Sequence, residues 1–185
     1  MQSDMLLTSL KSPLSKKRTE ELSRTIAESD FSIKELIDLT FHPEEQIGFR
    51  AAWILETVFI NNPTCFIPNS PYFLTKFRQQ ENPSAQRHFS KILALMTAKK
   101  ALKPIKVLFA TYNTEELVET VFNWLINEKV PVAVKSHCLN ILANFSSKHD
   151  WIKDELIETM DFLLDKESIA FYAKVKQIRR QLSKS

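Results

Sequence analysis

The chain has 185 residues, of which 44% are hydrophobic and 25% are charged, and its formal net charge is +3 at pH 7. This composition is that of one ordinary globular domain with a sizeable core, and the small basic excess is only weak evidence for an anionic partner. The single glycine, Gly48, excludes Walker A, Rossmann and G-x-S-x-G sites, because their tight backbone turns require several glycines.

The N-terminal residues predict a helix with one solvated face. Leu14, Leu22 and Ile26 form a narrow apolar stripe among Lys and Arg. We expect residues 1–29 to form an N-terminal segment with a capping helix. Asp4 stands where a signal peptide carries positive charge, and no apolar run is long enough to span a membrane, so we expect a cytoplasmic protein.

A capping box at Ser32 and Glu35 begins a short helix, and Pro43 then opens a long helix that ends near Asn61. Its segment "FRAAWILETVFI" (49–60) is apolar around most of the helix. Such a helix is stable in water only when neighbours cover it on more than one side.

The remaining segments also predict helices separated by Pro, Asn and Ser. Residues 61–71 are expected to be a loop. The segment 105–112 ("IKVLFATY") fits either a helix or a buried strand, and we assign it as a helix. The last helix carries a single apolar stripe, as a terminal helix should. The expected helices cover 72–80, 84–102, 105–112, 114–129, 132–148, 150–166 and 168–183.

A short helix followed by a long one recurs along the chain. Near the start of each long helix, an apolar residue is followed by a basic position. The apolar residue falls at positions 49, 89, 134 and 173, giving intervals of 40, 45 and 39 residues. "HPEEQIGF" and "NPSAQRHF" share Pro, Gln and Phe at the same spacing, and "VKSHCLNIL" carries a basic-then-apolar pattern. In these features the chain resembles the HEAT/armadillo-like helical repeat family, whose repeats have periods of about 40–47 residues.

The resemblance implies an all-α fold: a short right-handed α-α superhelix of about 8–10 helices, with the repeat domain at 30–182 and a tail at 183–185. Ser90 departs from the basic position of the pattern, and the Asp frequent in HEAT turns is missing from most turns. An irregular helical bundle is the alternative fold.

A solenoid binds partners along the inner edge of its second helices, so polar strips on those helices predict a groove. Side chains four residues apart on one face can contact a peptide backbone or a phosphate chain; alternatively, they tie helices together or face water. The candidate groove residues are Arg50, Trp53, Thr57, Asn61, Arg87, Lys91, Lys135, Ser136, His137, Asn140 and Asn144.

A second candidate surface is a basic patch, although clusters of this kind are usually solvated faces. It consists of Lys99, Lys100, Lys103, Lys106, Arg179 and Arg180. We predict no metal site and no cofactor, because the His and Cys residues lack ligand spacing. No catalytic constellation is recognised: Cys65 and Cys138 are read as free thiols, and the acidic pairs lie at polar helix starts.

The leading hypothesis is a non-catalytic scaffold that binds a protein or peptide partner through its groove. One alternative is nucleic-acid binding, resembling the HEAT-like DNA glycosylases that excise alkylated bases, and another is a small-molecule enzyme of unrecognised type. The sequence does not predict the oligomeric state. For stability, we predict that Phe49→Ala costs about 3–5 kcal/mol because Phe49 is expected to be interior.

Overall fold

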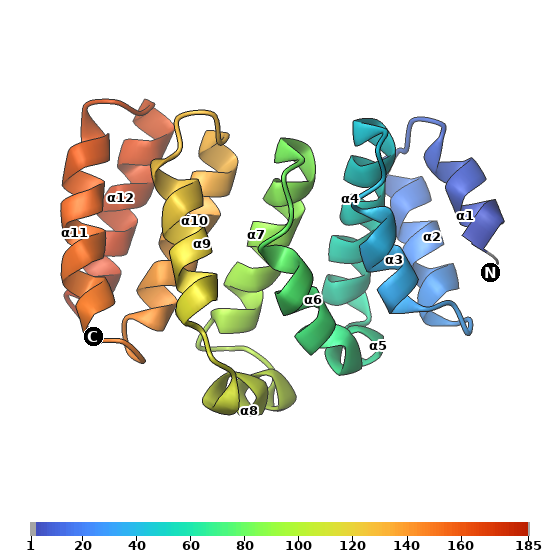
Figure 1. The fold of residues 1–185 in the computed structure, drawn as a ribbon, viewed down its shortest axis with the longest axis horizontal. Helices are drawn as coiled ribbons and strands as arrows, with labels where there is room; N and C mark the ends of the chain where they lie inside the picture. The colour runs from blue at the N-terminus through green and yellow to red at the C-terminus, as the bar shows by residue number, and fades with distance from the viewer. Residues whose placement is uncertain (1–2, 185) are drawn as a thin grey trace. The chain divides into compact units, whose positions relative to one another are not determined.

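The computed structural model describes residues 3–184, which are helical throughout apart from turns and short connections (Figure 1). No strand occurs in this range. Residues 1–2 and 185, which belong to the predicted N-terminal segment and tail, lie outside it. The helices are α1 (Ser3–Leu10), α2 (Lys16–Ala27), α3 (Ile33–Leu39), α4 (Glu45–Asn61), α5 (Pro63–Phe66), the 3-10 helix η1 (Ile67–Asn69), α6 (Ser70–Phe77), α7 (Pro83–Thr97), α8 (Lys103–Thr111), α9 (Glu115–Ile126), α10 (Val132–Phe145), α11 (Trp151–Leu164) and α12 (Ile169–Leu182).

The predicted all-α fold is confirmed, with more helices than the expected number. The predicted loop at 61–71 instead forms α5, η1 and the start of α6, because Pro63, Pro68 and Pro71 each occupy a first-turn position where the missing N–H costs nothing. A further short helix, α1, precedes the predicted capping helix. The ambiguous segment "IKVLFATY" lies mostly in α8, as assigned.

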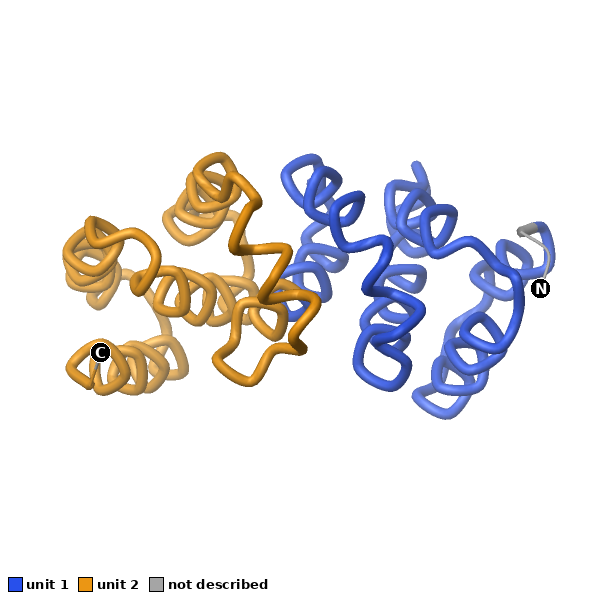
Figure 2. The backbone as a smooth tube through the Cα atoms, turned by 90° about the horizontal axis from the view of Figure 1, so that it is seen from below, with its two compact units in different colours: residues 1–92 blue, residues 93–185 orange. Residues whose placement is uncertain are grey.

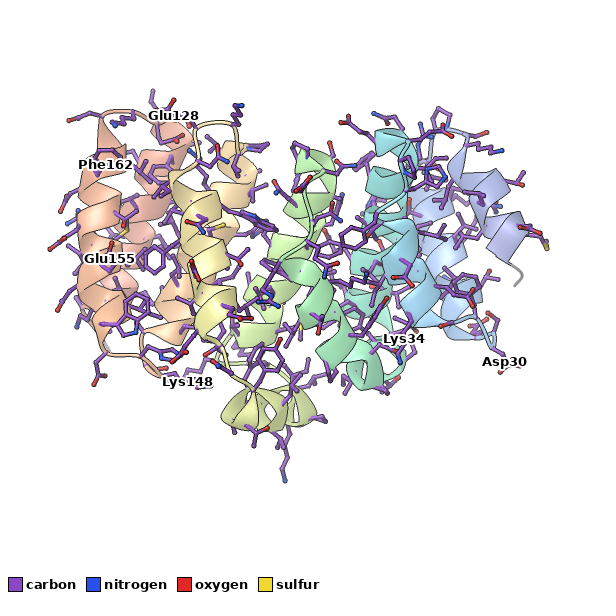
Figure 3. All side chains as sticks on the ribbon, in the orientation of Figure 1. Asp30, Lys34, Glu128, Lys148, Glu155 and Phe162 are labelled. Atoms are coloured by element: carbon purple, nitrogen blue, oxygen red, sulfur yellow. The ribbon has the colours of Figure 1, made fainter. Side chains whose placement is uncertain are left out.

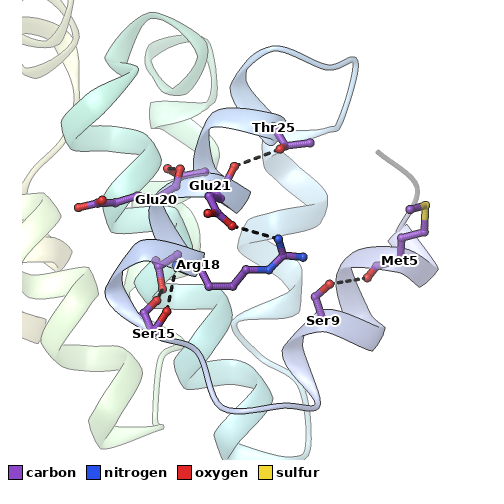
Figure 4. A network of polar contacts seen from close by, with 9 residues as sticks. Met5, Ser9, Ser15, Arg18, Glu20, Glu21 and Thr25 are labelled. Carbon is purple, nitrogen blue, oxygen red and sulfur yellow. Dashed lines mark hydrogen bonds and ion pairs between the residues drawn. The ribbon is translucent and has the colours of Figure 1, made fainter.

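Serine side chains begin several helices. The Ser15 hydroxyl accepts a hydrogen bond from the Arg18 N–H at the start of α2, and one turn of that helix carries the Arg18–Glu21 ion pair (Figure 4). Ser32 caps α3 in the same way, as the capping box predicts. Ser168 caps α12. These caps fix where the chain turns between neighbouring helices.

The chain divides into two compact units, residues 1–92 and 93–185 (Figure 2). In the first unit, α4 packs against α2 and α3 and also contacts α1 and α5. Its residues Ala52, Leu55 and Phe59 are buried. This packing explains why α4 is apolar around most of its circumference, and the prediction of an interior helix is confirmed.

An aromatic cluster fills the core of the first unit. Phe66, Phe73, Phe77 and Phe89 are all fully buried. The ring of Phe73 lies 5.4 Å from that of Phe66 and 4.9 Å from that of Phe89, measured between centroids. These rings join α5, α6 and the middle of α7, so this cluster makes a large contribution to the hydrophobic stabilisation of the unit.

Gly48 allows α3 and α4 to approach closely. A Cβ atom at this position would lie 2.8 Å from the backbone oxygen of Thr40, a distance that real Cβ contacts do not show. The Thr40 oxygen also accepts a hydrogen bond from the buried Gln80 side chain. The glycine is therefore required by the packing of the repeat.

In the second unit, α10 packs against α9, α11 and α12. Its buried residues point in several directions, as on α4. On α12 only one stripe is buried, consisting of Phe171, Val175, Ile178 and Leu182. The prediction that α12 packs through one face is confirmed.

Candidate functional site

The first unit contains a hollow of about 330 Å³ between α2, α4 and the middle of α7. We call it the α4 groove. Four of the predicted groove residues line it: Trp53, Thr57, Asn61 and Lys91. The other lining residues are Lys16, Thr19, Glu20, Glu56 and Ile60.

Apolar and polar groups alternate in the α4 groove. Ile60 is 47% exposed, and Trp53 is half-buried with its ring stacked on Phe49 at 6.2 Å between centroids. Within residues 3–184, the Asn61 amide has no intramolecular hydrogen-bond partner. The groove therefore offers an aromatic surface, an aliphatic side chain and a free amide to a ligand.

A charged network lies at the edge of the α4 groove. The Glu56 carboxylate is buried and accepts hydrogen bonds from His88 Nδ1 at 2.6 Å and from Lys91 Nζ at 2.5 Å. Both oxygens are thus occupied by groups on α7. The network joins the second helices of adjacent repeats and holds the Lys91 stem against the groove.

We expect Glu56 to make the folding stability depend on acid. Burial raises the pKa of the Glu56 carboxyl, but the hydrogen bonds and charges of His88 and Lys91 outweigh burial, so this pKa is below its ordinary value. Such a carboxylate stabilises the fold above its unfolded-state pKa of about 4.3, and this stabilisation is lost as the pH falls through the folded-state pKa. In urea unfolding at neutral pH, Glu56→Gln should lower the free energy of unfolding by about 1–3 kcal/mol.

The difference between wild type and Glu56→Gln should shrink as the pH is lowered below about 4. A difference that stays the same at every pH would contradict this account, because it would show that the carboxylate charge is not the stabilising feature.

Arg50 and Arg87, which were predicted to line the same groove, lie elsewhere. The Arg50 guanidinium donates a hydrogen bond of 2.7 Å to the Leu10 carbonyl oxygen at the end of α1. It therefore serves as a tie between helices. Arg87 is exposed and is absent from the lining of the α4 groove.

Among the predicted groove residues on α10, Lys135 and Asn144 are engaged in contacts within the second unit. Lys135 is 1% exposed and its ammonium forms an ion pair with Glu167. The Asn144 amide donates to Thr97 Oγ1 at 3.2 Å. Ser136, His137 and Asn140 are half-buried on the same helix.

The basic patch is divided between two hollows of the second unit. Lys99 and Lys106 line a hollow of about 350 Å³ beside α8, which we call the α8 hollow. Arg179 and Arg180 line a different hollow, of about 530 Å³, between α11 and α12, where Arg179 pairs with Asp161. Lys100 and Lys103 are exposed and line neither.

Comparison with known protein families identifies the architecture. A family model described as HEAT repeat domain matches residues 6–185. The chain belongs to the HEAT repeat family. Searches among curated proteins and among solved structures gave no match. The suspected resemblance is thereby confirmed, and the chain is a helical repeat scaffold of the kind commonly used for protein interaction.

The cysteines of this HEAT repeat chain are poor nucleophiles. Complete burial raises the pKa of the Cys138 thiol far above its usual range. Partial burial also raises the pKa of the Cys65 thiol. Both thiols stay protonated at neutral pH, and the thiolate is the reactive form.

Two further observations describe residues 3–184 of the HEAT repeat chain. No helix in this range is both long enough and apolar enough to cross a lipid bilayer. No group of three or more His, Cys, Asp or Glu side chains in it is arranged to hold a metal ion.

Sequence reasoning missed the Glu56–His88 contact and the α8 hollow. Glu56 and His88 are 32 residues apart in different HEAT repeats, so no local motif joins them. Their spacing also falls short of the intervals of 39–45 residues between repeats, so the repeat pattern does not pair them either. The predicted basic patch contains Lys99 and Lys106 of the α8 hollow, but the apolar floor of the hollow has no sequence signal, because its residues come from three different helices.

Proposed function

We propose that this HEAT repeat chain is a non-catalytic scaffold that binds an extended segment of a protein partner in the α4 groove. The observation that supports this proposal is the composition of the groove, where half-buried Trp53 and exposed Ile60 lie beside the Asn61 amide. Apolar anchors with adjacent hydrogen-bonding groups suit a peptide, whose side chains and backbone need both.

The charge of the groove favours a protein partner over nucleic acid. Its lining contains two lysines and two glutamates, so it has no positive excess to attract phosphates. Of these, Lys91 is already paired with Glu56, and Lys16 lies 3.9 Å from Glu20. A neutral groove with an aromatic wall fits an uncharged or mixed peptide segment.

The Glu56–His88 pair does not support the enzymatic alternative. A general base needs a free oxygen within reach of a substrate and a pKa near the working pH. Both Glu56 oxygens already accept hydrogen bonds, and the pKa of its carboxyl is lowered. The pair has the features of a structural tie between repeats.

The test uses peptides selected from a random peptide library on the immobilised full chain, followed by calorimetric titration of wild type and variants. Trp53→Ala should weaken binding by at least about tenfold, because aromatic residues dominate binding energy at such sites. The matched control is Trp151→Ala, which removes a 53% exposed tryptophan on α11 that stacks on Phe122.

Circular dichroism of each variant controls for folding, because Trp53 also packs on Phe49. Selected peptides that bind Trp53→Ala and wild type with equal affinity would reject the α4 groove as the binding site. So would peptides whose binding is lost in Trp151→Ala instead.

A further inference from the structure

The α8 hollow in the second unit combines an apolar floor with a cationic rim. Met96, Phe109 and Phe145 form the floor and are each less than one-tenth exposed. Lys99, Lys106 and Lys148 provide the positive charges. These groups come from the end of α7 and the turn after it, from α8, and from the end of α10 and the turn after it.

The positive charge of the rim is not balanced by carboxylates. No Asp or Glu lines the hollow, and the sequence contains none from Asn82 to Thr114. Within residues 3–184, neither Lys99 nor Lys106 forms an ion pair, and both are exposed. A ligand carboxylate placed there would gain charge-assisted hydrogen bonds without displacing an existing partner.

The third cation is held in place by the fold. Lys148, labelled in Figure 3, donates hydrogen bonds from Nζ to the carbonyl oxygens of Phe109 at 2.8 Å and Tyr112 at 3.1 Å. These carbonyls end α8, where the helix dipole is negative and favours a cation. Lys148 therefore positions α8 as one wall of the hollow.

We propose that the α8 hollow is a docking site for an acidic segment of a protein partner. One apolar side chain of the segment enters the hollow and contacts Phe109 and Phe145, and flanking Asp or Glu carboxylates pair with Lys99 and Lys106. The concave apolar floor distinguishes this ligand from a phosphate backbone, which has no side chain to bury, and from a flat membrane surface. This site is separate from the α4 groove and does not depend on the function proposed for it.

The probe is a short fluorescent peptide in which glutamates flank one central phenylalanine, titrated into the full chain by fluorescence anisotropy. Lys99→Glu/Lys106→Glu should weaken binding by at least about tenfold. The matched control, Lys129→Glu/Lys184→Glu, makes the same change of net charge at exposed lysines outside the hollow and should change affinity by no more than about twofold.

A second pair of measurements tests the apolar floor. Ala110→Trp places a large side chain on an exposed position that lines the hollow, and it should block the probe without altering charge. Replacing the central phenylalanine of the probe with serine should weaken binding to wild type. Trp53→Ala should leave the affinity for the probe unchanged, so failure of one proposal is distinguishable from failure of the other.

Several results would overturn the proposal. The first is an absence of measurable binding of the probe at low salt. The second is equal weakening by both double charge reversals, which would indicate only long-range attraction. The third is a combination of two results. Lys99→Glu/Lys106→Glu loses affinity for a DNA duplex or for vesicles containing phosphatidylserine, and the probe binds wild type equally well with and without its phenylalanine.

Discussion

Replacing Phe89 with alanine is expected to lower the free energy of unfolding by about 3–5 kcal/mol. The Phe89 ring is fully buried, and its centroid lies 4.9 Å from that of Phe73 and 6.0 Å from that of Phe41. Alanine would leave a cavity where α6, α7 and the turn after α3 meet. The loss combines the cost of no longer burying the ring with the loss of its contacts to the surrounding rings. Urea unfolding followed by circular dichroism measures the change.

Phe162→Ala is the matched control for Phe89→Ala. Phe162, labelled in Figure 3, is 59% exposed on α11, and the Lys166 ammonium lies 3.6 Å from the centroid of its ring. We expect a change within about 1 kcal/mol for this control. Equal losses for the two variants would mean that the aromatic cluster is not the main source of stability in the first unit.

The sequence alone predicts a loss of this size for Phe49→Ala, but the structure places Phe49 differently. Phe49 is half-buried, with its ring 6.2 Å from that of Trp53 and 5.5 Å from that of His88. Because solvent already reaches one side of this ring, Phe49→Ala leaves a smaller cavity than Phe89→Ala. We therefore revise the expected loss for Phe49→Ala to below that for Phe89→Ala, although its helix is interior as predicted.

Removing the Glu167 carboxylate should have an effect of similar size in the second unit. Lys135 is 1% exposed, so its ammonium relies on Glu167 for neutralisation. Glu167→Ala leaves a buried charge without its partner, which typically costs about 3–5 kcal/mol. Thermal and urea unfolding of the variant would measure the loss.

The companion variant separates the ion pair from the packing. Lys135→Met/Glu167→Ala removes both charges and keeps a flexible apolar side chain at position 135, so it should recover most of the stability lost in Glu167→Ala. Glu155→Ala, at an exposed position on α11, is the control and should change stability by less than about 0.5 kcal/mol. A double variant as unstable as Glu167→Ala would contradict the role assigned to the pair.

The repeat organisation could be predicted because it depends on features that are local in sequence. The breadth of the apolar surface on α4 and the single stripe on α12 follow from whether a helix has neighbours on several sides or on one. Phe49 and Phe89, one period apart, lie near the start of α4 and near the middle of α7. The N-cap of α3 at Ser32 could be predicted for the same reason, since a cap acts within one turn of its helix.

The roles of the basic residues could not be predicted, because they depend on partners far along the chain. Lys135 pairs with Glu167, 32 residues away, whereas the pattern of the repeat gave no indication that its ammonium is buried. Arg50 binds a backbone carbonyl at Leu10, and a carbonyl has no sequence signature. A basic residue in a repeat pattern is consistent with a groove, a tie or a core ion pair, and only the tertiary contacts distinguish them.

The sparse anchoring of α8 has a consequence for dynamics. This nine-residue helix buries only Ile105 and Phe109, and the carbonyl oxygens at its end accept hydrogen bonds from Lys148 in the turn after α10. Amide hydrogen exchange should therefore be faster here than in α10, and trypsin should cut native protein first after the exposed Lys99, Lys100 or Lys106. Opening of α8 removes one wall of the α8 hollow, so a bound segment would slow both amide exchange and tryptic cleavage of α8. Binding to the hollow is therefore coupled to the local folding of this helix.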